Sequence, residues 1–307
     1  MDARNLHGLA ATQNWLLKED QILEYLTQGQ LAHALRTEEL ITVFPRVYKP
    51  WGAPEWWEQR VQAACWSVDG TASHRCGGRV HRIEVAASRI ELTVPYPRQV
   101  RMRGVKVHSS NLLLPEFVTE VDGIPVTTPD RTCLDLSAVC GIDTLERAWG
   151  SAHYLGLVTP DSLLRTAIKM RARGRRRWTT VDQLLQSWVP HFDLGQVELQ
   201  ARTLGWIRAD GGFDEPEVEF WIVLNGRRYR LDLAWPSRKI CIECDGWAAH
   251  GRNRLRFDSD RDKIPELELA GWLVIPTTSR QSRAVVLDRL RRAFALRPTD
   301  FSAIDRV

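Results

Sequence analysis

The stretch RLDLAWPSRKICIECDG, residues 230–246, decides the fold of the C-terminal region, because it reads as two apolar strands joined by a turn. Side chains alternate along a strand, so Asp232 points away from the face that its apolar neighbours share. Glu243 and Asp245 alternate in the same way on the second strand. A four-residue loop over 236–239 would place Asp232 directly across from Glu243.

The same register would place Leu233 across from Ile242. Carboxylates inside an apolar hairpin are costly unless something compensates them, and two directly opposed acids repel each other. A bound cation reverses the sign of that interaction, which points to metal-dependent cleavage of phosphodiesters. The alternative is a solvated strand face whose acids pair with nearby arginines or lysines.

The residues after this hairpin favour the metal site. They keep a fixed order: Gly246, Trp247, His250, Gly251, the run DSDRDK over 258–263, and LELAGWLVI over 267–275. The last run reads as the end of a helix, a glycine cap and another buried strand. The order D…ExDG…H…D..K…L..AGW resembles the very-short-patch-repair-like endonucleases of the PD-(D/E)XK superfamily, from about Glu198 to Thr278.

The resemblance implies a metal-binding pair, Asp232 and Glu243, with Asp245 as a third ligand and catalytic residue. Mg²⁺, or Mn²⁺ in its place, is the implied cofactor, since a hard cation takes oxygen ligands. Such an ion lowers the pKa of an attacking water and neutralises charge on the phosphate.

The resemblance also implies three further catalytic residues, with one departure from the family pattern. Asp245 stands where many members place the lysine of ExK, so Lys263 on the following helix would supply the missing positive charge. Glu198 resembles the acidic residue on the first helix of the domain, and His250 the histidine that transfers protons. Pro265 predicts that this helix begins close to Lys263, which makes the reach of the lysine decisive.

The cysteines do not predict a zinc site. Cys241 and Cys244 have CxxC spacing, but on a strand they point to opposite faces. We interpret Cys244 as a core residue and Cys241 as a neighbour of the carboxylates. Reduced thiols in a cytoplasmic protein fit the six cysteines best.

Length and composition are those of a globular protein with two or three domains. The chain has 307 residues, 44% of them hydrophobic and 26% charged, and a formal net charge of +4. No apolar run marks the N-terminus, and no stretch approaches the roughly 20 apolar residues of a membrane span, so neither a signal peptide nor a membrane segment is expected.

A basic cluster, KMRARGRRRW over 169–178, precedes the nuclease-like region. Arg175, Arg176 and Arg177 in this run are candidate contacts to DNA phosphates. A solvated linker is an equally good interpretation of the same residues.

The middle segment predicts a small α/β region. Strands are expected over 79–86, 90–94, 104–109 and 118–128, followed by a helix that Thr128 caps and by helices over 145–155 and 160–168. Between 79 and 168 we find no nucleophile, base or metal cluster. The run GIPVTTPDRTCLDL over 123–136 resembles the C-terminal part of AbiEi-type antitoxins of abortive-infection systems, and Arg131 and Asp135 are expected to form a structural ion pair.

The first fifty residues predict a winged helix-turn-helix. Helices are expected from 19 and over 30–36, followed by a two-stranded wing over 40–48 that places Arg46 where glycine is usual. Gln30, His33 and Arg36 are the candidate DNA contacts, with Gln28 beside them. A dimerisation module remains the alternative.

Together these patterns predict an α+β (α/β) protein with a restriction-endonuclease-like mixed sheet at its C-terminus. The expected parts are a winged helix over 1–50, an AbiEi-like domain over 51–168, a basic linker or helix over 169–190 and the nuclease-like domain over 191–297. The expected function is a metal-dependent DNA endonuclease. The alternative is a non-catalytic DNA-binding regulator or antitoxin with a degenerate nuclease fold. DNA is the expected partner, a homodimer stays open, and a toxin partner follows only from the resemblance.

Overall fold

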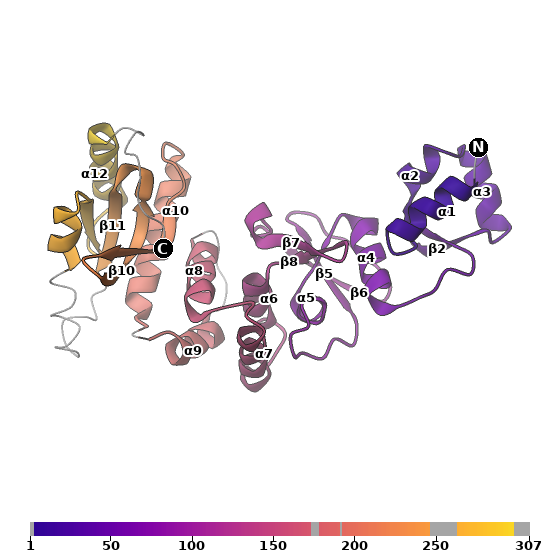
Figure 1. The fold of residues 1–307 in the computed structure, drawn as a ribbon, viewed down its shortest axis with the longest axis horizontal. Helices are drawn as coiled ribbons and strands as arrows, with labels where there is room; N and C mark the ends of the chain where they lie inside the picture. Colours follow the sequence, from indigo (N-terminus) through magenta and orange to yellow (C-terminus); the bar gives the residue numbers. More distant parts are fainter. Residues whose placement is uncertain (1–2, 173–177, 191, 246–262, 298–307) are drawn as a thin grey trace. The chain divides into compact units, whose positions relative to one another are not determined.

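The computed structural model describes residues 3–172, 178–190, 192–245 and 263–297 (Figure 1). The chain forms two compact units, 1–159 and 160–307, which are described separately below. Helices and strands are mixed in both units, which confirms the α+β class. Among the described residues, none of the helices combines the length and the apolar character that crossing a membrane would require.

The start of the first unit contains the helices and the wing expected there. Two helices are followed by a hairpin, and the short strand β1 pairs with the second strand of that hairpin. Arg46 forms the hairpin turn with a φ of 62°, the left-handed conformation that explains why glycine is usual at this position. The elements are α1 (Ala3–Thr12), β1 (Leu17–Lys18), α2 (Glu19–Leu23), α3 (Gln28–Arg36), β2 (Leu40–Phe44) and β3 (Val47–Pro50).

The rest of the first unit is a five-stranded mixed sheet in the order β6-β5-β4-β8-β7, with helices packed on it. Its elements are α4 (Trp57–Val68), β4 (Thr71–Ala72), α5 (His74–Val80), β5 (Ile90–Pro95), β6 (Val105–Ser110), the short helix η1 (Pro115–Phe117), β7 (Val118–Val121), β8 (Ile124–Thr127), α6 (Pro129–Leu136) and α7 (Ile142–Tyr154). The expected strand over 79–86 was wrong, because helix α5 runs to Val80 and an irregular segment follows it. The alternating pattern there reflects a helix end packed on the core, where Val80 and Ile83 are buried.

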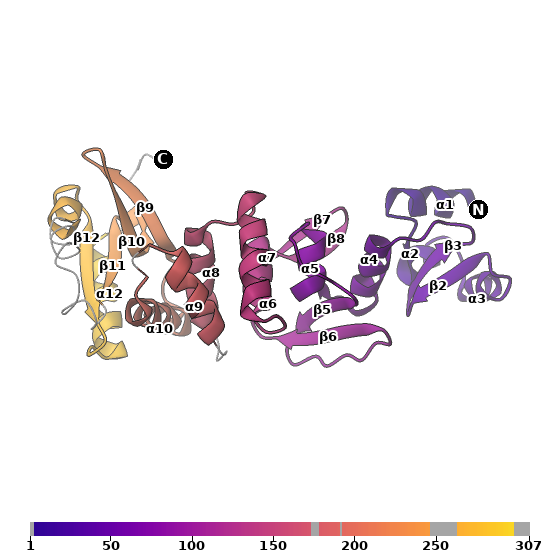
Figure 2. The same ribbon diagram turned by 90° about the horizontal axis from the view of Figure 1, so that it is seen from below.

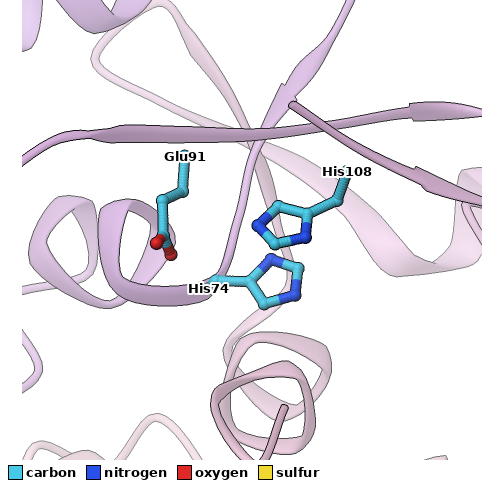
Figure 3. A group of neighbouring side chains, drawn as sticks. All are labelled: His74, Glu91 and His108. Atoms are coloured by element: carbon cyan, nitrogen blue, oxygen red, sulfur yellow. The ribbon is translucent and has the colours of Figure 1, made fainter. Parts of the chain in front are cut away.

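The sheet also brings together three residues that the sequence analysis did not connect. His74 begins α5, Glu91 lies on β5 and His108 lies on β6 (Figure 3). Their ligand atoms all lie within 4.8 Å of one another. The expectation of no metal cluster concerned residues 79–168, and this group combines two residues of that range with His74, which precedes it. Parallel pairing of β5 and β6 creates this proximity, and spacing along the chain does not reveal such pairing.

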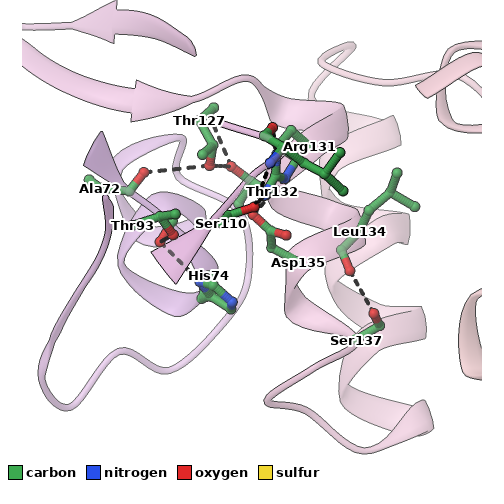
Figure 4. Close-up of polar contacts among 12 residues, drawn as sticks. Ala72, His74, Thr93, Ser110, Thr127, Arg131, Thr132, Leu134, Asp135 and Ser137 are labelled. Atoms are coloured by element: carbon green, nitrogen blue, oxygen red, sulfur yellow. Dashed lines mark hydrogen bonds and ion pairs between the residues drawn. The ribbon is translucent and has the colours of Figure 1, made fainter. Parts of the chain in front are cut away.

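A buried ion pair links helix α6 to the end of β6 in the same unit. The Arg131 Nε donates to Asp135 Oδ2 at 2.9 Å, and both side chains are almost fully buried (Figure 4). The guanidinium also donates to the Leu112 carbonyl and to Ser110 Oγ. These contacts tie α6 to the end of β6, which confirms the expected structural role of the pair.

The second unit is built on a four-stranded mixed sheet in the order β12-β11-β10-β9 (Figure 2). It begins at Pro160, so the helix that we placed at the end of the preceding domain belongs here, where it packs against α10. The elements are α8 (Pro160–Arg171), α9 (Thr179–Trp188), α10 (Leu194–Asp210), β9 (Glu217–Leu224), β10 (Arg227–Trp235), η2 (Pro236–Arg238), β11 (Ile240–Asp245), a helix over 263–269, β12 (Leu273–Thr278) and α12 (Arg283–Leu296).

Strand β12 is an outer strand of this sheet and pairs in parallel with β11. Pro276 lies on this strand, and its carbonyl accepts a hydrogen bond from Arg289 of α12 at 3.4 Å. Proline lacks a backbone N–H and is therefore tolerated at sheet edges, where that group would face away from the ladder.

Candidate active site

The β10–β11 hairpin has the register expected from its sequence. Leu233 pairs with Ile242, and the chain turns through η2 and Lys239. Lys239 has a φ of 49°, which closes the four-residue connection. Asp232 and Glu243 lie directly next to this paired step on their two strands.

Asp232 is held in place from two sides. Its side chain is only 2% exposed. The backbone N–H of Cys244 donates to Oδ2 at 2.6 Å, and the Gln196 amide donates to both carboxylate oxygens at 3.1 and 3.2 Å. Hydrogen bonds of this kind satisfy a buried carboxylate and fix its orientation.

Lys263 reaches the carboxylate of Glu243 from the following helix. Its Nζ forms an ion pair with Glu243 Oε2, and both side chains are largely buried. The described part of this helix runs over 263–269 and contains both Lys263 and Pro265. This helix therefore brings the positive charge of Lys263 to the acids of the hairpin.

The other oxygen of Glu243 is a buried acceptor. Glu243 Oε1 makes no hydrogen bond within the described part of the chain. Burial and the nearby Asp232 raise the pKa of Glu243 from 4.5 to about 8, against the opposing effect of Lys263. The pKa of Lys263 is also raised, because the attraction of Glu243 and Asp232 outweighs its burial. The site thus holds more negative charge than one lysine balances.

A third acid, Glu219, belongs to this group and was missed by the sequence analysis. It lies on β9, between the paired steps Phe220–Leu231 and Val218–Leu233, which places it beside Asp232. Glu219 is buried, forms an ion pair with Arg230 at 2.8 Å and accepts a hydrogen bond from the Gln200 amide at 2.9 Å. Burial is the largest cause that raises its pKa to about 7, and Asp232 adds to the shift.

Helix α10 presents glutamines to these acids. Gln196 and Gln200 are one helical turn apart and donate to Asp232 and Glu219, while Gln200 also donates to the Asp232 carbonyl at 2.7 Å. Glu198, the expected catalytic acid of this helix, is exposed. It lies near Arg171 and Asp182, whose pKa values it influences.

Two other expected site residues are not part of the described cluster. Asp245 ends β11 with an exposed side chain, and within the described ranges Asp232, Glu243 and Asp245 do not form a three-residue group of converging ligand atoms. His250 lies outside the described residues, as do Arg175, Arg176 and Arg177.

The cysteines of the hairpin are both buried and free. Burial raises the pKa of both thiols well above 9.0, and Glu243 and Asp232 raise the pKa of Cys241 further. A neutral Cys241 beside the acids matches its expected position, and neither thiol has the low pKa of a nucleophile.

The candidate DNA contacts lie on an exposed face of α3. Gln30, His33 and Arg36 are exposed, and the Arg36 guanidinium lies 3.0 Å from His33 Nδ1. Gln30 has a second role, because its side chain accepts hydrogen bonds from Thr27 in the N-terminal capping box of the helix.

Comparisons with known proteins add little to this geometry. No family model matches the chain, and no curated protein matches it. Among solved structures, the chain is similar to the RV2827C protein from Mycobacterium tuberculosis, with 11% identity and a TM-score of 0.32, over 68% of this chain and 76% of that chain. At this score the similarity assigns neither a fold nor a function.

Proposed function

We propose that the protein is a metal-dependent DNA endonuclease that hydrolyses phosphodiester bonds. The observation that carries the proposal is the group formed by Asp232, Glu243 and Lys263, in which two acids of one hairpin and a lysine of the next helix meet in a buried site. Burying charged groups is costly, so such groups are kept mostly where a function needs them.

The donors fit a hard divalent cation such as Mg²⁺ or Mn²⁺. Both acids offer oxygen atoms, and among the residues that the structure describes the buried Glu243 Oε1 has no hydrogen-bond partner. Burial is the largest cause of the raised pKa of Glu243, and Asp232 adds to it; a cation beside the carboxylate would favour its ionised form. When bound, the ion would lower the pKa of an attacking water and neutralise charge on the phosphate.

The protein's own groups would orient the site. The Gln196 amide and the Cys244 N–H hold the Asp232 carboxylate in one orientation, which leaves little reorganisation for the reaction. Lys263 limits the repulsion between the acids and is the cation available to a phosphate or to a water beside it. Glu219 adds negative charge next to Asp232, which favours cation capture over a neutral site.

The N-terminal module would recognise the substrate. Helix α3 follows α2 and precedes a two-stranded wing, the order of a winged helix-turn-helix, and its exposed face carries His33 and Arg36. In such modules the second helix enters the major groove.

The test is cleavage of supercoiled plasmid and short single-stranded DNA, with Mg²⁺, with Mn²⁺ and with EDTA. Glu243→Gln and Asp232→Asn should abolish cleavage, and Glu217→Gln should retain it, because Glu217 is an exposed acid on the neighbouring strand. Asp245→Asn decides whether that residue is a ligand. Cleavage that persists in Glu243→Gln would overturn the assignment of the site.

A non-catalytic regulator is the competing function, because a Glu243–Lys263 ion pair is equally compatible with a nuclease fold that does not cleave. Intact DNA binding without cleavage by the wild-type protein, in every metal condition, would favour that function.

A further inference from the structure

The first unit contains a group of side chains of metal-ligating types, far along the chain from the acids of the hairpin. His74 comes from the start of α5, Glu91 from β5 and His108 from β6, and their ligand atoms all lie within 4.8 Å of one another. His74 and Glu91 are buried, at 6% and 1% exposure. Figure 3 shows the two imidazole rings stacked face to face, with the carboxylate of Glu91 beside them.

One nitrogen in this group is a buried atom without a hydrogen bond. The Nε2 of His108 makes none to any described residue. Buried polar atoms are nearly always satisfied, so this nitrogen needs an explanation, and a bound ion supplies one. Burial lowers the pKa of His108, which favours the neutral imidazole that ligates metals.

The neighbouring contacts resemble the support that ligating residues receive. His74 Nδ1 lies 2.9 Å from Ser73 Oγ, which in turn lies 2.7 Å from Thr93 Oγ1 on β5. Hydrogen bonds of this type orient the ring of a metal-binding histidine. His74 also has a φ of 53°, a conformation that L-residues rarely adopt and that is often found at functional sites.

The charge of Glu91 is balanced only at a distance. Arg75 and Arg89 each approach its Oε1 no closer than 3.7 Å, and both arginines are partly exposed. The close contact of the carboxylate is the backbone N–H of Arg75, at 3.2 Å from Oε2. A cation at the group would therefore meet a buried carboxylate that is not tightly bound to either arginine.

We propose that His74, Glu91 and His108 bind a divalent transition metal of the zinc class. Two imidazole nitrogens and one carboxylate oxygen are a donor set that Zn²⁺ accepts, with water in the fourth position. Tetrahedral ligation at Zn–N distances of about 2.0–2.1 Å places donors roughly 3.3 Å apart, so the side chains have to close by a little over an ångström. The stacked rings, with centroids 3.8 Å apart, must also turn against each other.

Such an ion would join α5 to the paired strands β5 and β6. This site is independent of the proposed nuclease, because its residues all lie in the other unit. It would serve the structure of that unit.

The test uses the full chain, stripped with EDTA and titrated with Zn²⁺ by calorimetry. The same tight Zn²⁺ site should be present in the wild type, in Glu243→Gln, which removes a proposed ligand of the hairpin site, and in His7→Gln, a control that removes an exposed histidine. His108→Gln should weaken that site by about a hundredfold or more. His108 is only half-buried, so this variant should keep the wild-type circular dichroism spectrum. A folded His108→Gln protein that titrates like the wild type would overturn the proposal.

A measurement on the wild type alone keeps the test independent of folding defects. Zinc X-ray absorption of the protein loaded with one equivalent should show two imidazole ligands. A shell of oxygen ligands without imidazole would refute the site.

Discussion

Replacing Glu243 with glutamine should stabilise the metal-free second unit at neutral pH. The pKa of Glu243 is 4.5 in the unfolded reference and about 8 in the fold. The folded state therefore holds a proton that the unfolded state has lost, and stability falls as the pH rises from about 4.5 to about 8. The raised pKa of Lys263 contributes at higher pH, near its ordinary value of 10.5, and leaves this window unchanged.

The size of the effect follows from that window. At pH 7 the wild type lies two and a half pH units above the unfolded pKa, and at about 1.36 kcal/mol per unit the cost is on the order of 3 kcal/mol. Glutamine cannot ionise, so Glu243→Gln does not carry this pH-dependent cost. It does lose the ion pair with Lys263, and that loss does not depend on pH in this range. For a unit of this size the shift in Tm is roughly 6–12 °C at pH 7 and close to zero near pH 5.

Scanning calorimetry between pH 5 and pH 8, in EDTA, checks this prediction. Glu217→Gln is the matched control, because that exposed acid should show no such trend. Adding Mg²⁺ should reduce the difference in Tm between Glu243→Gln and the wild type, since a bound cation stabilises the ionised Glu243 of the folded wild type. A gap that is constant with pH would refute the reasoning, whatever its sign.

Two smaller predictions concern packing and DNA binding. Gly205→Ala should destabilise the second unit by about 1–3 kcal/mol, because the added Cβ would lie 2.9 Å from the Ala172 carbonyl oxygen. Gly150→Ala should stabilise the first unit by up to about 1 kcal/mol, because its Cβ would meet nothing within 4 Å. Thermal unfolding of both variants tests these opposite signs. Arg36→Ala should weaken DNA binding and reduce the slope of log K against log salt by about 0.9, and an unchanged slope in a fluorescence-anisotropy titration would exclude a phosphate contact by this residue.

The hairpin was predictable because its signals are local. Strand alternation and the length of the turn fix the pairing of Leu233 with Ile242, and this register brings Asp232 to Glu243. The start that Pro265 predicts for the helix of Lys263 falls next to residues outside the described ranges, so it stays a prediction. Each of these inferences needed only neighbouring residues.

The residues that were missed depend on long-range pairing or on helix phase. Glu219 reads from the sequence as a solvated strand acid like Glu217, and only the pairing of β9 with β10 places it in the site. On α10 the sequence draws attention to Glu198, but the packing turns the glutamines toward the acids. His108 was overlooked because of long-range strand pairing as well, since the sequence does not indicate which strand pairs in parallel with β6.

Pro276 has a consequence for assembly. Pro276 has no backbone N–H to donate, and its carbonyl already accepts from Arg289, so the edge of β12 is blocked against an incoming strand. Among the described strands of this sheet, β9 forms the opposite border, with the partly exposed Trp221 and Val223 on it. A second molecule that extends this sheet by strand addition would therefore have to join at β9, the strand that carries Glu219. Oligomerisation by this route would then be coupled to the cation binding proposed for the neighbouring acids.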